Sequence, residues 1–236
     1  MTQIKNWVAI IPARKGSKRL PNKNLLKLGN QSLVEIAVQK ALDTNIFEKV
    51  IISSDSQEIV DLAQKKGAMA FGLRKPNLSN DLSKTEDVIL DLLNQKELSG
   101  IDGFTLIQCT SPFTKLETIK NITLEAFKNK CSSISIRELE HTYLEWLLIK
   151  KGRYLSPIAH NSDEPNVRSQ DATKVLCPTG NAYAVNKEYF LKYNSLLGPY
   201  SEPYLINSNY ELIDIDERKD FKNAEKIFKK YHLVQK

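Results

Sequence analysis

The sequence predicts an α/β protein with a mostly parallel sheet that helices cover on both faces. Two observations support this fold class. Short apolar runs of strand length alternate along the first half of the chain with segments whose apolar residues recur at helical spacing. Strands that alternate with helices of this length are typical of parallel sheets whose crossovers carry the helices. Sheets of this kind bind ligands at the carboxyl ends of their strands.

The predicted elements follow in a regular order. Strands are expected over residues 7–11, 50–53, 104–108 and 133–136, and again from about 180 to 185. Helices are expected over about 33–42, 57–66, 85–93, 116–128 and 219–230. Asp55 or Ser56 is a suitable cap for the second of these helices, and Thr85 for the third. The loops at 12–24, 53–55 and 108–112 then lie at the binding edge.

The alternating pattern breaks between residues 137 and 175. Residues 143–149 are typical of a strand, residues 150–153 of a turn, and a long polar stretch follows. We interpret 137–175 as an inserted hairpin and loop within a single domain over 1–236. Tyr143 and Trp146 give the insertion apolar surface that a partner subunit could cover.

Composition excludes several classes of protein. The chain has 236 residues, 41% hydrophobic and 26% charged, which is ordinary for a globular protein. No apolar run reaches the length of about 18 residues that predicts a membrane span, and the N-terminus lacks a secretory h-region. Three widely spaced cysteines fit reduced thiols, so we expect a cytoplasmic protein. The net charge of +6 comes without an aromatic-studded basic stripe, which disfavours nucleic-acid binding.

The loop after the first strand carries five cations between residues 14 and 23. Neither G-x-G-x-x-G nor G-x-x-x-x-G-K-[ST] occurs in the chain, which disfavours dehydrogenases and P-loop nucleoside triphosphatases. A phosphate site built from Arg14, Lys23, the Ser17 hydroxyl and backbone N–H groups remains. The alternative is a solvated basic turn, but these cations follow a core strand rather than lie in a tail.

Asp214-Ile215-Asp216 is the candidate metal site. In an extended segment the two carboxylates point to the same side, roughly 7 Å apart at Cα, while Ile215 faces the core. Such a pair suits a hard cation held between carboxylates and substrate phosphates. Taken alone, so short and common a motif favours the alternative, in which Asp216 or Asp220 caps the final helix and Asp214 is solvated. The basic loop shifts the balance toward the metal site.

Two further segments place polar groups near the binding edge. Gln108, Thr110 and Ser111 follow the third predicted strand, although an ordinary exit into a turn explains them as well. Arg74 is either an anion or base contact or part of a loop that leads to the helix at Thr85.

Together these segments resemble the acylneuraminate cytidylyltransferases, which activate nonulosonic (sialic-acid-like) sugars as CMP derivatives. The matching segments occur in family order over nearly the whole chain. They are Ile11-Pro12-Ala13-Arg14 with Ser17-Lys18, Leu20 to Asn24, Phe47 to Ile51 with Ser54-Asp55, Arg74 with Leu78 and Asp81, Gln108 with Thr110-Ser111-Pro112, Arg168-Ser169-Gln170, Pro178 with Gly180 and Tyr183, and Asp214-Ile215-Asp216.

The resemblance implies a Rossmann-like nucleotide-diphospho-sugar transferase fold, a homodimer and dependence on Mg²⁺. The implied reaction joins CTP and an acidic nine-carbon sugar into CMP-sugar and diphosphate, and 137–175 corresponds to the family's dimerisation element. By position, Arg14 and Lys23 would hold the triphosphate and, with Asp214 and Asp216 on Mg²⁺, carry catalysis. Ala13, Asn24, Arg74 and Thr85 would line the cytidine site, while Gln108, Thr110, Ser111, Arg168 and Tyr183 would serve the sugar.

Two departures from the family pattern concern the sugar. The sialic acid enzymes lead us to expect a lysine near Glu145 and an arginine near Cys177, and both cations are missing here. We therefore expect an acceptor other than N-acetylneuraminic acid, such as a legionaminic or pseudaminic acid. The alternatives are a cytidylyltransferase for another acidic sugar such as Kdo, a nucleotidyltransferase acting on a sugar phosphate, and a non-catalytic sensor of the same fold.

Overall fold

The computed structural model describes residues 4–159 and 167–234. Its main sheet has six strands in the order β10-β6-β9-β5-β1-β4, in which only β9 runs antiparallel to its neighbours. The sheet strands are β1 (Trp7–Pro12), β4 (Lys49–Ser53), β5 (Gly103–Ile107), β6 (Ser132–Tyr143), β9 (Lys174–Asn186) and β10 (Ser201–Leu205). The mostly parallel sheet predicted from the sequence is thereby confirmed.

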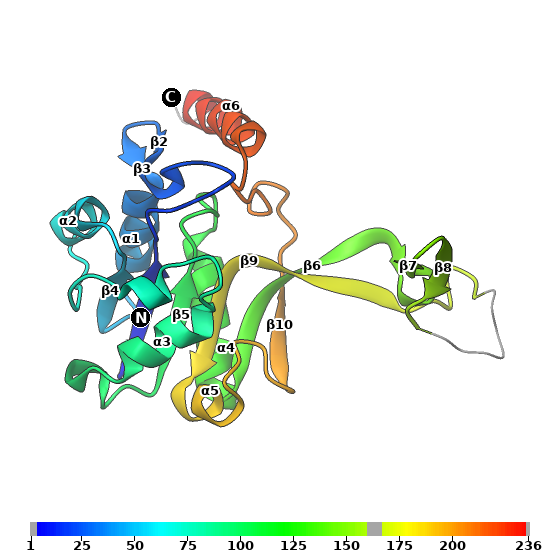
Figure 1. Ribbon diagram of the computed structural model, residues 1–236, viewed down its shortest axis with the longest axis horizontal. Coiled ribbons are helices and arrows are strands. Elements are labelled where there is room, and N and C mark those ends of the chain that lie inside the picture. Colours follow the sequence, from blue (N-terminus) through cyan, green and yellow to red (C-terminus); the bar gives the residue numbers. More distant parts are fainter. Residues whose placement is uncertain (1–3, 160–166, 235–236) are drawn as a thin grey trace.

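Helices cover both faces of this sheet (Figure 1). Alternate residues of β1 enter different cores: Ala9 and Ile11 pack with α1 and α2, whereas Val8 and Ile10 pack with α3 and α5. The helices are α1 (Leu33–Asp43), α2 (Gln57–Lys65), α3 (Thr85–Leu93), α4 (Leu116–Asn129), α5 (Lys187–Tyr193) and α6 (Arg218–Val234). Short 3₁₀ turns lie at Lys23–Leu25, Pro76–Leu78, Lys96–Leu98 and Leu144–Trp146.

The predicted cap of α3 is wrong, and that of α2 is right in position only. Thr85 is the first residue of α3, and Lys84 occupies the cap position without a side-chain hydrogen bond. Ser56 does precede α2, but its side chain makes no capping bond, and Asp55 instead accepts a hydrogen bond from the backbone N–H of Lys15 at 2.7 Å. The Asp55 carboxylate therefore stabilises the loop after β1 rather than the start of α2.

The region 137–175 differs from the predicted hairpin and loop where it joins the main sheet. Strands β6 and β9 continue beyond the core as a long two-stranded extension, with Glu138 opposite Leu176 and Tyr143 opposite Lys174. A separate hairpin, β7 (Leu148–Lys151) with β8 (Tyr154–Pro157), lies at its far end (Figure 1). Residues 144–146 form a 3₁₀ turn, so the strand expected over 143–149 is wrong there. Residues 160–166 of the predicted insertion lie outside the described residues.

Two small features complete the fold. A two-stranded ribbon, β2 (Lys27–Leu28) with β3 (Gln31–Ser32), leads into α1, and Ser32 and Glu35 cap that helix reciprocally. None of the helices in the described part of the chain combines the length and apolar character that a membrane crossing requires.

Candidate active site

A cleft of about 310 Å³ lies at the carboxyl ends of β1 and β5. The loops after these strands form one side of it, and the segment from Arg74 to Val88 forms the other. Seven of the residues predicted for the site line it together: Arg14, Lys23, Asn24, Arg74, Thr85, Gln108 and Thr110. The binding edge expected for a parallel sheet is therefore hollowed where the polar residues converge.

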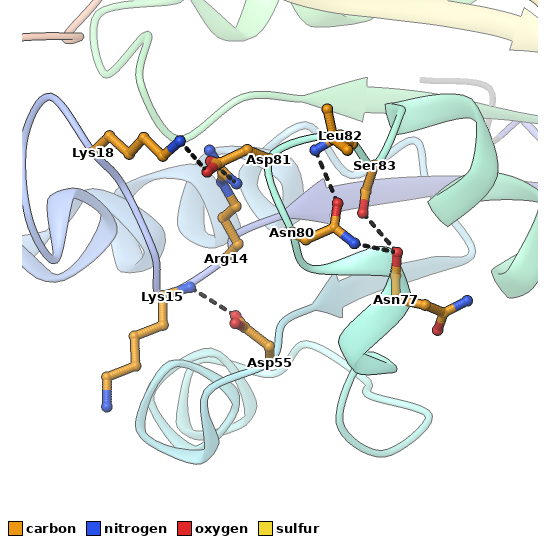
Figure 2. A network of polar contacts seen from close by, with 9 residues as sticks. All are labelled: Arg14, Lys15, Lys18, Asp55, Asn77, Asn80, Asp81, Leu82 and Ser83. Carbon is orange, nitrogen blue, oxygen red and sulfur yellow. Dashed lines mark hydrogen bonds and ion pairs between the residues drawn. The ribbon is translucent and has the colours of Figure 1, made fainter.

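The N-terminal loop is fixed by hydrogen bonds to its neighbours. The backbone N–H of Ala13 donates to the Ser53 carbonyl at 2.9 Å, and the Asn24 side-chain amide donates to the Arg14 carbonyl at 2.9 Å. Figure 2 shows the bond from the Lys15 backbone to Asp55. Ala13 as a whole is fully buried and, unlike the seven residues above, does not line the cleft.

A second hollow of about 400 Å³ continues from the cleft along the basic loop. Ser17 lines it together with Gly16, Lys18 and Arg19, and the two hollows share Arg14, Lys23 and Asn24. Cations and a hydroxyl along a continuous groove are suited to an extended chain of phosphates.

Two carboxylates pair with four cations of this loop. Asp81 accepts from Arg14 at 2.9 Å and from Lys18 at 2.7 Å, and Asp216 accepts from Arg19 and from Lys23 at 2.9 Å each. The side chain of Lys23 is only 14% exposed, in contrast with 80% for Lys18. Lys23 is therefore the cation held most firmly inside the groove.

The predicted metal-binding segment lies beside the loop that follows β5. The backbone N–H of Ile215 donates to the Thr110 carbonyl at 2.8 Å, and the Ile215 side chain is fully buried, as the alternation predicts. Burial raises the pKa of Asp214, and the charge of Asp216 adds to this, while a hydrogen bond from the Thr110 side chain acts in the opposite direction. The two carboxylates are thus close enough to repel each other.

Asp216 and Asp220 have different roles. Burial raises the pKa of Asp216, but the hydrogen bond and charge of Lys23, with Arg19, outweigh it and leave the pKa below its usual value. The carboxylate of Asp220 accepts from the backbone N–H groups of Asp216 and Glu217 at 3.1 and 2.8 Å, at the start of α6. Asp220 is therefore the helix cap, and the Asp216 carboxylate faces the basic loop.

The segment that carries the two aspartates is anchored by Glu211. This buried carboxylate accepts from the Lys115 backbone N–H at 2.9 Å and the Thr118 hydroxyl at 2.7 Å, at the start of α4. Its backbone carbonyl accepts from the Asn181 amide of β9 at 2.7 Å. Sequence reasoning missed Glu211 and Asn181, because their partners are distant in the chain.

Arg74 is held at the end of β4. Its Nε donates to the Ser53 hydroxyl at 3.0 Å, and its backbone N–H donates to the Ser54 carbonyl at 2.7 Å. Burial lowers the pKa of this guanidinium. The arginine thereby fixes the entry of the segment that forms the far side of the cleft.

The residues predicted to face the sugar are spread over three locations. Gln108 and Thr110 line the cleft, and the Thr110 hydroxyl donates to the side-chain amide oxygen (Oε1) of Gln108 at 3.3 Å. Ser111 is buried behind them, and its hydroxyl has no hydrogen-bond partner among the described residues. Tyr183 lies in β9 opposite Leu106, and burial raises its pKa, with smaller contributions from Cys177 and Asp214.

Arg168 does not lie in this cleft. It is exposed in the extension, next to Val167, whose carbonyl accepts a hydrogen bond from the Trp146 indole at 3.2 Å. Figure 1 shows that the extension projects away from the main sheet. Arg168 is therefore not brought together with the residues that line the cleft.

Lys40 of α1 clamps the turn that follows the cleft loop. Its ammonium donates to the carbonyls of Pro112 and Thr114 at 2.5 Å each. Burial lowers the pKa of Lys40 to about 8, against the charge of Glu211, which raises it. Between about pH 8 and the ordinary value of 10.5, the unfolded chain therefore holds a proton that the folded protein lacks.

The stability that Lys40 contributes is consequently expected to increase as the pH rises from 8 to 10. Urea denaturation of the wild type and of Lys40→Met at several pH values measures this, because the variant removes the titrating group. Over this pH range we expect the free energy of unfolding of the wild type to rise, relative to that of Lys40→Met, by on the order of 1–3 kcal/mol. A difference that stays constant over this range would contradict the burial of the charge.

Comparison with known proteins identifies the family. A family model described as Cytidylyltransferase matches residues 8–233, which is nearly the whole chain. The chain belongs to the cytidylyltransferase family. The enzyme class and the resemblance drawn from the sequence motifs are thereby confirmed.

Relatives of this cytidylyltransferase are named for nonulosonic acids. The pseudaminic acid cytidylyltransferase of Campylobacter jejuni is 29% identical over 95% of this chain and 97% of its own length. The CMP-N,N'-diacetyllegionaminic acid synthase of Legionella pneumophila is 31% identical over 93% and 95%. The N-acylneuraminate cytidylyltransferase of Escherichia coli is 32% identical over 92% of this chain, which spans 51% of that longer protein.

Solved structures support the fold of the cytidylyltransferase. The CMP:2-keto-3-deoxy-manno-octonic acid synthetase complexed with CTP superposes with a TM-score of 0.69 at 16% identity, over 96% of this chain and 100% of that chain. A nucleotidyl transferase from Methanothermobacter superposes with a TM-score of 0.61 at 13% identity, over 96% and 99%. The predicted nucleotidyltransferase fold is therefore confirmed, and nothing about substrates follows from identities this low.

Proposed function

We propose that this cytidylyltransferase joins CTP to an acidic nine-carbon sugar and releases diphosphate. The observation that carries the proposal is the meeting of the basic groove with the paired aspartates at one edge of the sheet, where Asp216 contacts both Arg19 and Lys23. The three relatives described above act on pseudaminic, legionaminic and acylneuraminic acids by name.

The nucleotide is assigned to the cleft and the adjoining groove. Arg14 and Lys23, with the Ser17 hydroxyl, hold the triphosphate, because a guanidinium fork and a semi-buried ammonium neutralise phosphate oxygens from two sides. The cytidine is assigned to the part of the cleft lined by Asn24, Arg74 and Thr85, and Ala13 supports this part from its buried position. The buried bonds of Arg74 to the end of β4 keep this wall in place.

Mg²⁺ is assigned to Asp214 and Asp216. Among the described residues no group of three or more histidine, cysteine or acidic side chains could hold a metal alone. A pair of carboxylates still fits Mg²⁺, which is commonly bound through one or two carboxylates plus substrate phosphates. Burial raises the pKa of Asp214, with a smaller contribution from the charge of Asp216, and a bound cation would stabilise both charged carboxylates. When bound, the ion neutralises developing charge on the phosphate oxygens.

The reaction requires alignment more than covalent catalysis. A sugar hydroxyl oxygen bonds to the α-phosphorus of CTP as the bond to the bridging oxygen breaks and diphosphate leaves. Arg14 and Lys23 hold the leaving phosphates in line with the attacking oxygen and stabilise their charge. The acceptor for the hydroxyl proton is assigned to one of the two aspartates.

The sugar is assigned to Gln108, Thr110 and Tyr183 of one subunit, with Ser111 supporting their loop, and to Arg168 of a second subunit. Apolar side chains on the hairpin are strongly exposed, among them Leu148 at 51% and Leu155 at 67%. Their burial in a homodimer would remove this surface from water. The arginine would then pair with the sugar carboxylate in the site of its partner.

The acceptor is assigned to the modified nonulosonic acids rather than to N-acetylneuraminic acid. Glu145 stands where the sialic acid enzymes suggest a lysine, and its carboxylate accepts from the Thr173 N–H at 2.9 Å and hydroxyl at 2.6 Å. Cys177 stands near the expected arginine. The extension therefore lacks both cations, near Glu145 and near Cys177, that the sialic acid enzymes lead us to expect.

A diphosphate-release assay with CTP, Mg²⁺ and a panel of acidic sugars tests the proposal. The panel contains legionaminic, pseudaminic and N-acetylneuraminic acids and Kdo. We expect the highest kcat/KM with legionaminic or pseudaminic acid. N-acetylneuraminic acid or Kdo as the best substrate would overturn the acceptor assignment. No release with any sugar, from a folded protein that binds CTP, would indicate a nucleotide sensor instead.

A further inference from the structure

Asp81 lies across the mouth of the proposed nucleotide site. Its two carboxylate oxygens divide between two cations of the basic loop: Oδ1 accepts from Arg14 at 2.9 Å, and Oδ2 accepts from Lys18 at 2.7 Å (Figure 2). The hydrogen bonds from Lys18 and Arg14 hold the pKa of Asp81 below its usual value, so the group is an anion at neutral pH. Asp81 lines both the cleft and the groove that continues from it.

Asp81 occupies the position of an anion bound to Arg14, which is assigned to the triphosphate, and to Lys18, which lines the adjoining groove. A carboxylate and a phosphate present the same kind of acceptor oxygens to guanidinium and ammonium groups. Asp216 occupies the matching pair, Arg19 and Lys23. A bound cation would engage Asp216 when the nucleotide arrives, whereas the ion pairs of Asp81 are both with cations of the basic loop.

The loop that carries Asp81 does not depend on this contact. The Asn80 side chain accepts from the Leu82 N–H at 2.9 Å, and the Ser83 hydroxyl donates to the Asn77 carbonyl at 2.8 Å (Figure 2). The Asp81 side chain is 43% exposed and the Arg14 side chain 37%. Exchanging one anion for another at this surface requires a side-chain movement and no unfolding of the loop.

We propose that Asp81 competes with phosphates for Arg14 and Lys18, giving way when the triphosphate binds and returning when diphosphate leaves. Because diphosphate must break charge-assisted bonds to depart, an internal anion that takes over its cations speeds release. The inference rests on the proposed CTP site. It makes Asp81 a positioning residue that acts through Arg14 and Lys18.

Asp81→Asn separates this role from a structural one. Asparagine keeps the shape of the side chain but no longer competes as an anion. We expect inorganic diphosphate and CTP to bind roughly three- to tenfold more tightly, the range for relieving two exposed ion pairs. In turnover, KM for CTP falls, kcat falls and diphosphate inhibits more strongly, because release becomes slower.

Calorimetry with inorganic diphosphate and with CTP at low ionic strength, followed by steady-state kinetics, tests the inference. Asp91→Asn is the matched control, because Asp91 pairs with Lys75 at the start of the same loop without lining either hollow. The control should bind both ligands as the wild type does. Unchanged or weaker binding by Asp81→Asn, in a protein whose wild type binds CTP, would overturn the inference. A wild type that binds neither ligand would overturn the proposed nucleotide site itself.

Discussion

Asp216→Asn is expected to lower the turnover of CMP-sugar on the order of a thousandfold while the fold remains intact. Asparagine preserves the shape of the side chain but removes one of the two carboxylates proposed to hold Mg²⁺ and leaves Lys23 and Arg19 without their anion. Diphosphate release measured over a range of Mg²⁺ concentrations checks the turnover, and thermal unfolding followed by circular dichroism checks the fold. The free energy of unfolding should change by about 1 kcal/mol or less, because the lost ion pairs are partly exposed.

Asp220→Ala is the matched control, four residues along the chain. Its carboxylate accepts from two backbone N–H groups at the start of α6, so we expect it to lower the free energy of unfolding by about 1 kcal/mol and to keep most of its turnover. The two variants should therefore show opposite patterns. Near-normal turnover in Asp216→Asn would mean that the basic loop needs no metal-binding partner at this position.

The core of the fold could be predicted because the spacing of its apolar residues along the chain indicates both the type of element and the face that is buried. Residues 7–11 are apolar in succession, and the structure buries them on both faces of the sheet between two helical layers. The helix over 85–93 carries Val88, Ile89, Leu92 and Leu93 at helical spacing, and all four are buried. Such patterns lie within short stretches of the sequence, so they can be recognised without knowing which distant residues come into contact.

The extension could not be predicted in its actual form. Beyond Ile136, strand β6 leaves the core and its residues become mostly exposed, so no buried face imposes an alternating pattern on the sequence. The pairing of β6 with β9 joins residues far apart in the chain, such as Glu138 and Leu176, which are 38 positions apart. The local pattern at 143–149 therefore predicted a strand where the chain makes a 3₁₀ turn.

Contacts between distant charges were equally invisible in the sequence. Arg14 and Asp81 are 67 positions apart, and Lys23 and Asp216 are 193 apart. Asp81 stands in an ordinary polar turn, and only its place in the family motifs singled it out. The choice between Asp216 and Asp220 as the cap of α6 was also open until the carboxylates could be placed.

Mixing two inactive variants is expected to restore activity if the extension of one subunit serves the site of its partner. Arg168→Ala removes the proposed contact to the sugar carboxylate, and Asp216→Asn removes the proposed metal ligand, so each homodimer has two defective sites. A mixed dimer has one intact site, made from the Asp216 of one subunit and the Arg168 of the other. Random pairing then gives about a quarter of wild-type activity.

Coexpression of the two variants with different tags, isolation of the mixed dimer and a diphosphate-release assay measure the recovery. The mixed dimer purified away from both homodimers should show about half of the wild-type activity per dimer. An inactive mixed dimer would place Arg168 in its own subunit's site, whereas an active Arg168→Ala homodimer would place Arg168 outside catalysis altogether. Leu148→Asp together with Leu155→Asp serves as the second arm of the experiment: if these exposed side chains form the dimer interface, the double variant sediments as a monomer and loses activity even though its cleft is unaltered.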